Sequence, residues 1–161
     1  MESVQSCLEV INRTLRKSIP PVYFFLSLLL MFALSYFMPV SHLIYIPLRV
    51  LGALLILLGL AITVWGAYCF SKVDTPVRIF EKTTTLVTVG PYQYSRNPMY
   101  LGLVIILTGT WIALGTFSPL FVIPVFFYIV QEGFIKYEEK ILEDSFTAEY
   151  PDYREKVRRW L

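Results

Sequence analysis

Three long stretches with almost no charge constrain the fold of this chain more than any other feature of its sequence. Residues 22–40 and 44–70 are apolar apart from Arg49, and residues 99–130 carry no charge at all. A helix needs about 20 apolar residues to cross the hydrocarbon core of a bilayer. The first two stretches each suit one crossing, and the third is long enough for two. We therefore predict an all-α integral membrane protein with about four transmembrane helices.

The composition agrees with one membrane domain and excludes several other classes. Of the 161 residues, 56% are hydrophobic and 16% are charged, whereas soluble domains are about 25% charged. The net charge is +2, and no basic run is interleaved with aromatic residues, so we expect no nucleic-acid partner. Cys7 and Cys69 form no Cys-x-x-Cys or Cys/His cluster, which predicts free thiols and no metal site. His42 is the only histidine, and we expect an interfacial polar residue rather than a base.

Local patterns divide the apolar stretches and the segments around them. Residues 1–19 place Leu8, Ile11 and Leu15 at helical spacing among charged residues, which predicts an amphipathic helix lying on the membrane surface. Residues 115–119, a Gly-Thr-Phe-Ser-Pro sequence, predict a tight turn that folds the third stretch into a helix hairpin.

Glycines recur every seven residues in the second apolar stretch, at Gly52, Gly59 and Gly66. This spacing lines small residues along one helix face, where a second helix can approach closely. We interpret the three glycines as packing residues and assign them no chemistry.

Lysine and arginine are distributed unevenly among the connections. They are frequent before residue 20, in the loop 71–97 and after residue 131, and absent from 41–48 and 115–119. With four crossings, the basic segments share one side, and the positive-inside rule makes that side the cytoplasm. We therefore expect both termini, the long loop and a C-terminal helix to be cytoplasmic.

The loop 71–97 is polar and long, which is typical of functional loops. Asn97 and Pro98 predict the start of a helix, with Asn as N-cap and Pro at the first position. Arg96 beside this helix start forms a positive, donor-rich spot suited to a carboxylate. The alternative is that Arg96 is an interfacial anchor and Asn97 only a cap.

Two adjacent carboxylates follow the third apolar stretch. On a regular helix Glu138 has only apolar neighbours, so its partner must come from Arg96 or from the ammonium or ribose hydroxyls of a ligand. Glu139 lies near Lys136 and Glu143, and we expect it to be solvated. The apolar neighbours of Glu138 are Phe134, Ile135, Ile141 and Leu142.

Three blocks occur in order along the chain. The first reads G-x-Y-x-x-x-R-N-P-x-Y-x-G from Gly90 to Gly102, the second is E-E-x-x-L from Glu138, and the third is F-x-x-x-Y-x-x-Y from Phe146. Over residues 83–160 this order resembles the isoprenylcysteine carboxyl methyltransferase and phospholipid methyltransferase superfamily. The sequence contains no glycine-rich Rossmann fingerprint.

The resemblance implies a methyltransferase that uses S-adenosyl-L-methionine and a lipophilic acceptor entering from the bilayer. It also implies a single domain over 1–161, with an interfacial segment at 1–19, two transmembrane helices within 20–70 and a catalytic, cofactor-binding region at 71–161. Arg96 and Glu138 would be catalytic. Cofactor contacts would fall on Thr84, Thr85, Leu86, Val87, Tyr92, Asn97, Pro98, Met99, Tyr100 and Glu138.

The chain departs from the eukaryotic carboxyl methyltransferases at three positions. They carry His at the positions of Thr84 and Asn97, and a substrate-binding Arg at the position of Phe134. Because Phe cannot replace that charge, the acceptor stays open between an isoprenylcysteine carboxylate and another small lipid or amine. Asn97 resembles the bacterial relatives and indicates a prokaryotic inner membrane.

Two other functions are compatible with the same sequence. The first is a non-catalytic membrane scaffold of the same fold. The second is an enzyme like the sterol reductases, whose C-terminal regions resemble this family. The Glu138-Glu139 pair followed by Tyr150 and Tyr153 favours the methyltransferase. The oligomeric state is not predicted.

Overall fold

The structure, a computed structural model, describes residues 20–40, 46–72 and 85–161. The expectations for residues 1–19, Cys7, His42 and Thr84 lie outside these ranges. The described ranges are helical and contain no strand. The helices are α2 (Pro20–Phe37), α3 (Ile46–Ser71), α4 (Pro98–Leu114), α5 (Val122–Val130), α6 (Lys136–Ser145) and α7 (Glu149–Lys156), with short turns η1 (Gly90–Gln93), η2 (Ser118–Phe121) and η3 (Gln131–Ile135).

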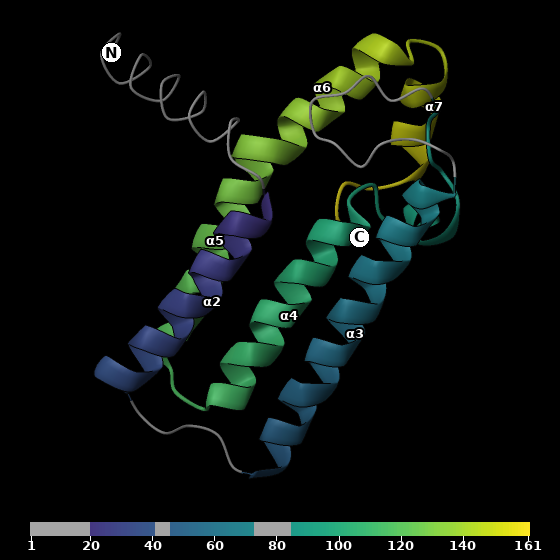
Figure 1. The fold of residues 1–161 in the computed structure, drawn as a ribbon. Coiled ribbons are helices and arrows are strands. Elements are labelled where there is room, and N and C mark those ends of the chain that lie inside the picture. Colours follow the sequence, from purple (N-terminus) through teal and green to yellow (C-terminus); the bar gives the residue numbers. More distant parts are fainter. Residues whose placement is uncertain (1–19, 41–45, 73–84) are drawn as a thin grey trace, which may run out of the picture.

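The long helices lie side by side as a bundle (Figure 1). α2 packs against α4 and α5, whereas α3 lies at the edge and packs chiefly on α4. The end of α3 and the starts of α2 and α4 lie at one end of the bundle, together with η1, α6 and α7. The segments that carry the sequence motifs are therefore gathered at one end, as the pattern of basic connections predicted.

Three helices in the described part are long and apolar enough to cross a membrane: Pro20–Phe37, Leu48–Ser71 and Ser118–Ser145. α4 is also apolar but shorter, with 17 residues, a length of about 26 Å. The structure thus agrees with an all-α membrane protein and places the predicted helices where the apolar stretches lie. Large apolar side chains on the outer surface, such as Phe25 and Leu29, are 66% and 67% exposed, as expected of side chains that face lipid.

The glycine repeat of α3 forms the contact with α4, as predicted. A Cβ added at Gly59 would lie 2.5 Å from the carbonyl oxygen of Gly102, and one at Gly52 would lie 2.7 Å from that of Gly109. Added carbon atoms at these distances would overlap the backbone of the opposite helix. Only glycine therefore allows α3 and α4 to pack this closely.

The predicted hairpin is present, and its second helix carries an irregular turn. α4 ends at Leu114, and Gly115 follows in the left-handed conformation with φ 75°, which glycine adopts without strain. α5 then continues through a π-helical turn, Gln131–Ile135, into α6. The core beside this turn is formed by residues such as Phe126 and Phe134, which are almost completely buried.

Candidate functional site at one end of the bundle

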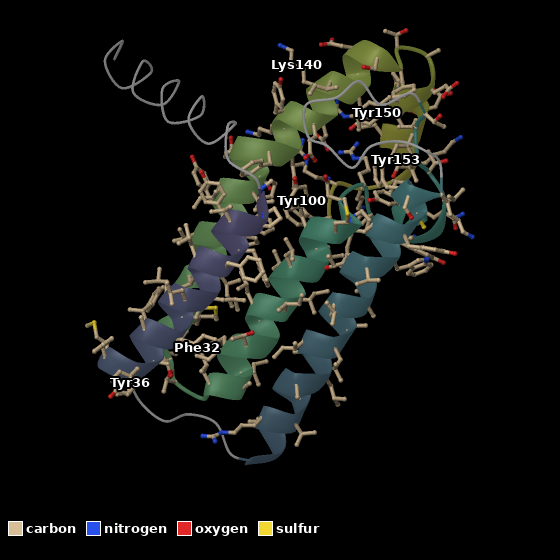
Figure 2. The ribbon with its side chains drawn as sticks, viewed as in Figure 1. Phe32, Tyr36, Tyr100, Lys140, Tyr150 and Tyr153 are labelled. Carbon is tan, nitrogen blue, oxygen red and sulfur yellow. The ribbon has the colours of Figure 1, made fainter. Side chains whose placement is uncertain are left out.

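A cavity opens where α6 and α7 meet the start of α4 and the end of α3. Its empty volume, including the open mouth, is about 610 Å³. Figure 2 shows Tyr100, Tyr150 and Tyr153 at this end of the molecule. The lining residues are Phe70, Thr85, Leu86, Val87, Tyr92, Arg96, Asn97, Met99, Tyr100, Glu138, Glu139, Leu142, Tyr150 and Tyr153.

The segment before α4 forms one wall of the cavity because of its glycine and proline. Gly90 has φ 65°, and a Cβ there would lie 2.8 Å from the Sγ of Cys69. Glycine therefore allows the chain to turn close against α3. Gly90 and Pro91 begin the short 3-10 turn Gly90–Gln93, in which Tyr92 is buried.

Glu138 on α6 accepts a hydrogen bond from α4. The hydroxyl of Tyr100 donates to its Oε1 at 2.7 Å. The expectation that the partner of Glu138 lies on another element is confirmed, but Arg96 is not that partner. Tyr100 lies in the first turn of α4, directly after the R-N-P motif. Its hydroxyl therefore joins the start of α4 to α6 at the cavity.

Glu139 was predicted to be solvated, and this was wrong. Its side chain is buried and pairs with two guanidinium groups. Arg96 Nη2 lies 3.0 Å from its Oε1, while Arg159 donates from Nε to Oε1 at 3.1 Å and from Nη2 to Oε2 at 2.5 Å. The cations come from segments far from Glu139 in the sequence, so the neighbours of Glu139 on its own helix gave no sign of them.

Asn97 occupies the N-cap position of α4, but its side chain does not cap the helix. Its Nδ2 donates instead to the carbonyl oxygen of Arg159 at 3.1 Å. The backbone N–H of Arg96 donates to the carbonyl of Arg158 at 3.0 Å, and Ser95 Oγ donates to that of Arg159 at 3.3 Å. The residues after α7 thus hold the segment 95–97 in place.

Two tyrosines of α7 line the cavity. The hydroxyl of Tyr153 donates to the carbonyl of Tyr92 at 2.6 Å, and Tyr150 is completely buried. Burial raises the pKa of Tyr150 to about 12, and burial also raises the pKa values of Tyr92 and Tyr153. These phenols are therefore protonated donors at neutral pH.

Three polar atoms of the lining residues are buried and have no hydrogen-bond partner within the described ranges. They are the hydroxyls of Tyr92 and Tyr150 and the Nε of Arg96. A fourth such atom, Trp111 Nε1, belongs to α4 but not to the cavity lining. Because buried polar groups are normally paired, three unpaired groups around one cavity indicate a place for a polar ligand.

The cavity gathers most of the predicted site residues. Pro98 and Phe134 are buried outside its lining: Pro98 starts α4, and Phe134 packs in the core with its ring 5.6 Å from that of Tyr23. The sequence motifs contained Glu139, Tyr150 and Tyr153 but did not predict them as site residues. No sequence signal pointed to the other two lining residues, Phe70 and Leu142, as site residues. The predicted residues that line the cavity are Thr85, Leu86, Val87, Tyr92, Arg96, Asn97, Met99, Tyr100 and Glu138.

Comparison with known proteins identifies the family. Residues 48–149 match the family model for phospholipid methyltransferases. Protein-S-isoprenylcysteine O-methyltransferase of Saccharomyces cerevisiae is 35% identical over 120 residues, which cover 67% of this chain and 46% of the yeast protein. The chain therefore spans about half the length of that relative.

A second relative is shorter. An uncharacterized protein of Haemophilus influenzae is 38% identical over 63 residues, covering 39% of this chain and 100% of the relative. No solved structure matches the chain. Because the family match extends over more than half of the sequence and includes the segments around Arg96 and Glu138, the chain belongs to the phospholipid methyltransferase family.

Proposed function

We propose that the protein transfers a methyl group from S-adenosyl-L-methionine to a lipophilic acceptor dissolved in the membrane. Membership of the family supports the class of reaction. The cavity lined by Glu138, Arg96 and unpaired tyrosine hydroxyls carries the proposal, because it lies at the end of a bundle whose outer surface is apolar. A water-soluble donor and a lipid-soluble acceptor can meet at such a place.

The charges around the cavity suit the amino-acid end of this cofactor. Glu138 offers a carboxylate for an ammonium or a ribose hydroxyl. Arg96 and Arg159 share the single carboxylate of Glu139, which leaves one positive charge in excess for a ligand carboxylate. The cavity residues that match the family motif would hold the cofactor, which supplies a methyl group already activated on a sulfonium.

The residues of the chain contribute orientation and exclusion of water. Tyr100 fixes the carboxylate of Glu138, and Phe70, Met99 and Leu142 present apolar surface to the same cavity. Holding two reactants in line in a dry site accounts for much of the rate increase in such transfers. We assign Arg96 and Glu138 to binding and orientation.

The acceptor is either of the isoprenylcysteine type, as the name of the yeast relative suggests, or another small lipid or amine. Phe134 has no charge to offer an acceptor, and its side chain is 1% exposed and packs in the core. We further propose that α4 is a fourth crossing and that the cavity faces the cytoplasm of a prokaryotic cell. The concentration of Lys and Arg at one end of the bundle supports this orientation.

Calorimetric titration of S-adenosylmethionine into the detergent-purified protein tests the proposal. We expect saturable binding to the wild type and about tenfold weaker binding to Glu138→Gln, since the neutral amide loses a charge-assisted contact. Asp144→Asn is the matched control, because it removes a carboxylate from an exposed position of the same helix. Absence of binding to folded wild type would contradict the proposed enzyme and favour the non-catalytic scaffold.

A further inference from the structure

The segment after α7, residues 157–160, does not line the cavity but contacts residues that do. Its backbone carbonyls accept hydrogen bonds from Ser95, Arg96 and Asn97. Its last residue, Trp160, donates from Nε1 to Gln131 Oε1 at 3.1 Å. The indole also stacks on Phe127, with ring centroids 4.5 Å apart. The segment is thus attached both to the start of α4 and to α5 and the π-helical turn, which precede α6 with Glu138 and Glu139.

Arg159 lies between these two attachment points. Its guanidinium forms two hydrogen bonds with Glu139, one to each carboxylate oxygen. This fork geometry fixes the carboxylate in orientation as well as in position, which a lysine ammonium does not do. Glu139 in turn contacts the guanidinium of Arg96.

Arg96 and Glu139 both line the cavity, and Arg96 is the cation of this chain of contacts that does so. Its side chain is 9% exposed, and its Nη1 donates to the carbonyl of Arg154 at 3.4 Å. Its Nε is buried and has no partner within the described ranges. The orientation of this unpaired donor depends on the contacts that hold the two terminal nitrogens.

We propose that Arg159 is a positioning residue of the methyl-donor site. Through Glu139 it holds the Arg96 guanidinium in the orientation that meets the carboxylate of the bound donor. This inference rests on the proposed function, because it assigns a residue outside the cavity to the binding of the same cofactor. It predicts that Arg159 affects only ligands that carry the carboxylate.

The experiment compares two ligands by calorimetry in detergent: S-adenosylmethionine and its decarboxylated form, which keeps the sulfonium, the ribose and the amine. We expect Arg159→Ala to weaken binding of S-adenosylmethionine about tenfold, the loss typical of one charge-assisted contact. Binding of the decarboxylated form is expected to stay at its wild-type value. Arg158→Ala is the control, because it removes the same charge from an exposed neighbour and should bind both ligands like wild type.

Arg159→Lys guards against loss of folding in the alanine variant. It keeps the charge but not the paired geometry, so its affinity for S-adenosylmethionine should fall between those of Arg159→Ala and wild type. The proposal is overturned if either Arg159 variant binds both ligands like wild type, or weakens both equally. If wild type binds neither ligand, the proposed function fails and this inference fails with it. If wild type binds S-adenosylmethionine and the Arg159 variants give one of the contrary results, only this inference fails.

Discussion

At the scale of single residues, the contact between Tyr100 and Glu138 joins two helices at the cavity. Without the phenol hydroxyl, Glu138 would lose its only hydrogen-bond donor in the described part of the chain. Leaving a largely buried carboxylate without its donor lowers the free energy of unfolding by about 1–3 kcal/mol. The contact therefore contributes to the stability of the site before any ligand binds.

Tyr100→Phe is expected to lower the unfolding free energy by about 1–3 kcal/mol, because it removes that donor and leaves the ring in place. Thermal melting in detergent measures the effect. Tyr94→Phe serves as control, since the Tyr94 side chain is 69% exposed. Equal melting temperatures for the two variants would contradict the structural role of the Tyr100 hydroxyl.

Tyr150 differs from Tyr100, because its buried hydroxyl has no partner among the described residues. Tyr150→Phe should therefore leave the melting temperature of the ligand-free protein unchanged or slightly higher. The stabilisation by saturating S-adenosylmethionine should decrease, because a weaker ligand stabilises less at a given concentration. A lower melting temperature without ligand, together with normal stabilisation by ligand, would show that the hydroxyl has a structural partner instead.

At the scale of elements, the contact between α3 and α4 sets the distance between the helices that support the cavity. Gly59→Ala would place a carbon atom 2.5 Å from the carbonyl of Gly102 and 2.9 Å from the amide nitrogen of Ile106. Backbone atoms cannot rotate away, so we expect a loss of about 1–3 kcal/mol, measured as a lower melting temperature. Ala61→Leu, on an exposed side of α3, should melt like wild type, and a similar drop in both variants would contradict the close-contact explanation.

A π-helical turn, Gln131–Ile135, joins α5 to α6 just before the two glutamates. A π turn contains one residue more than an α turn, and each residue rotates a helix by about 100°. Phe134 and Ile135, which were counted as helix neighbours of Glu138, fall in this turn and are therefore shifted. Lys136 and Glu143, from which Glu139 was judged, lie in regular α6. Turns of this kind are frequent at functional sites. The residue types of Gln131–Ile135 did not predict the π turn.

At the scale of the whole molecule, the cavity and the segment 157–160 lie at one end of the bundle, and the end of α2 lies at the other (Figure 1). Figure 2 marks these ends by Lys140 and Tyr36. The positive-inside rule predicts that the cavity end faces the cytoplasm. Single cysteines in a variant without Cys7 and Cys69 can test this orientation.

In intact cells, a membrane-impermeant maleimide should label Met38→Cys, which lies just after α2 and is 61% exposed. Lys140→Cys should react only after the membrane is permeabilised. The opposite pattern would reverse the orientation, and labelling of both residues in intact cells would exclude the arrangement in which the two ends lie on opposite sides.

The sequence by itself determined the class of fold, because the length of an apolar helix and the spacing of small residues are local properties. The apolar stretches form α2, α3 and the hairpin of α4 and α5. Gly52 and Gly59 form the contact with α4. The motifs around Arg96 and around Glu138 also indicated the family and most of the cavity, since the chain keeps the residues within each motif together.

Only the tertiary structure decided which charges meet. Glu139 is buried because Arg96 and Arg159, distant in sequence, reach it from the start of α4 and from the segment after α7. Phe134 is a core residue because the π turn and α2 enclose it. Ion pairs and burial of this kind depend on how elements pack, and no pattern along one helix contains that information.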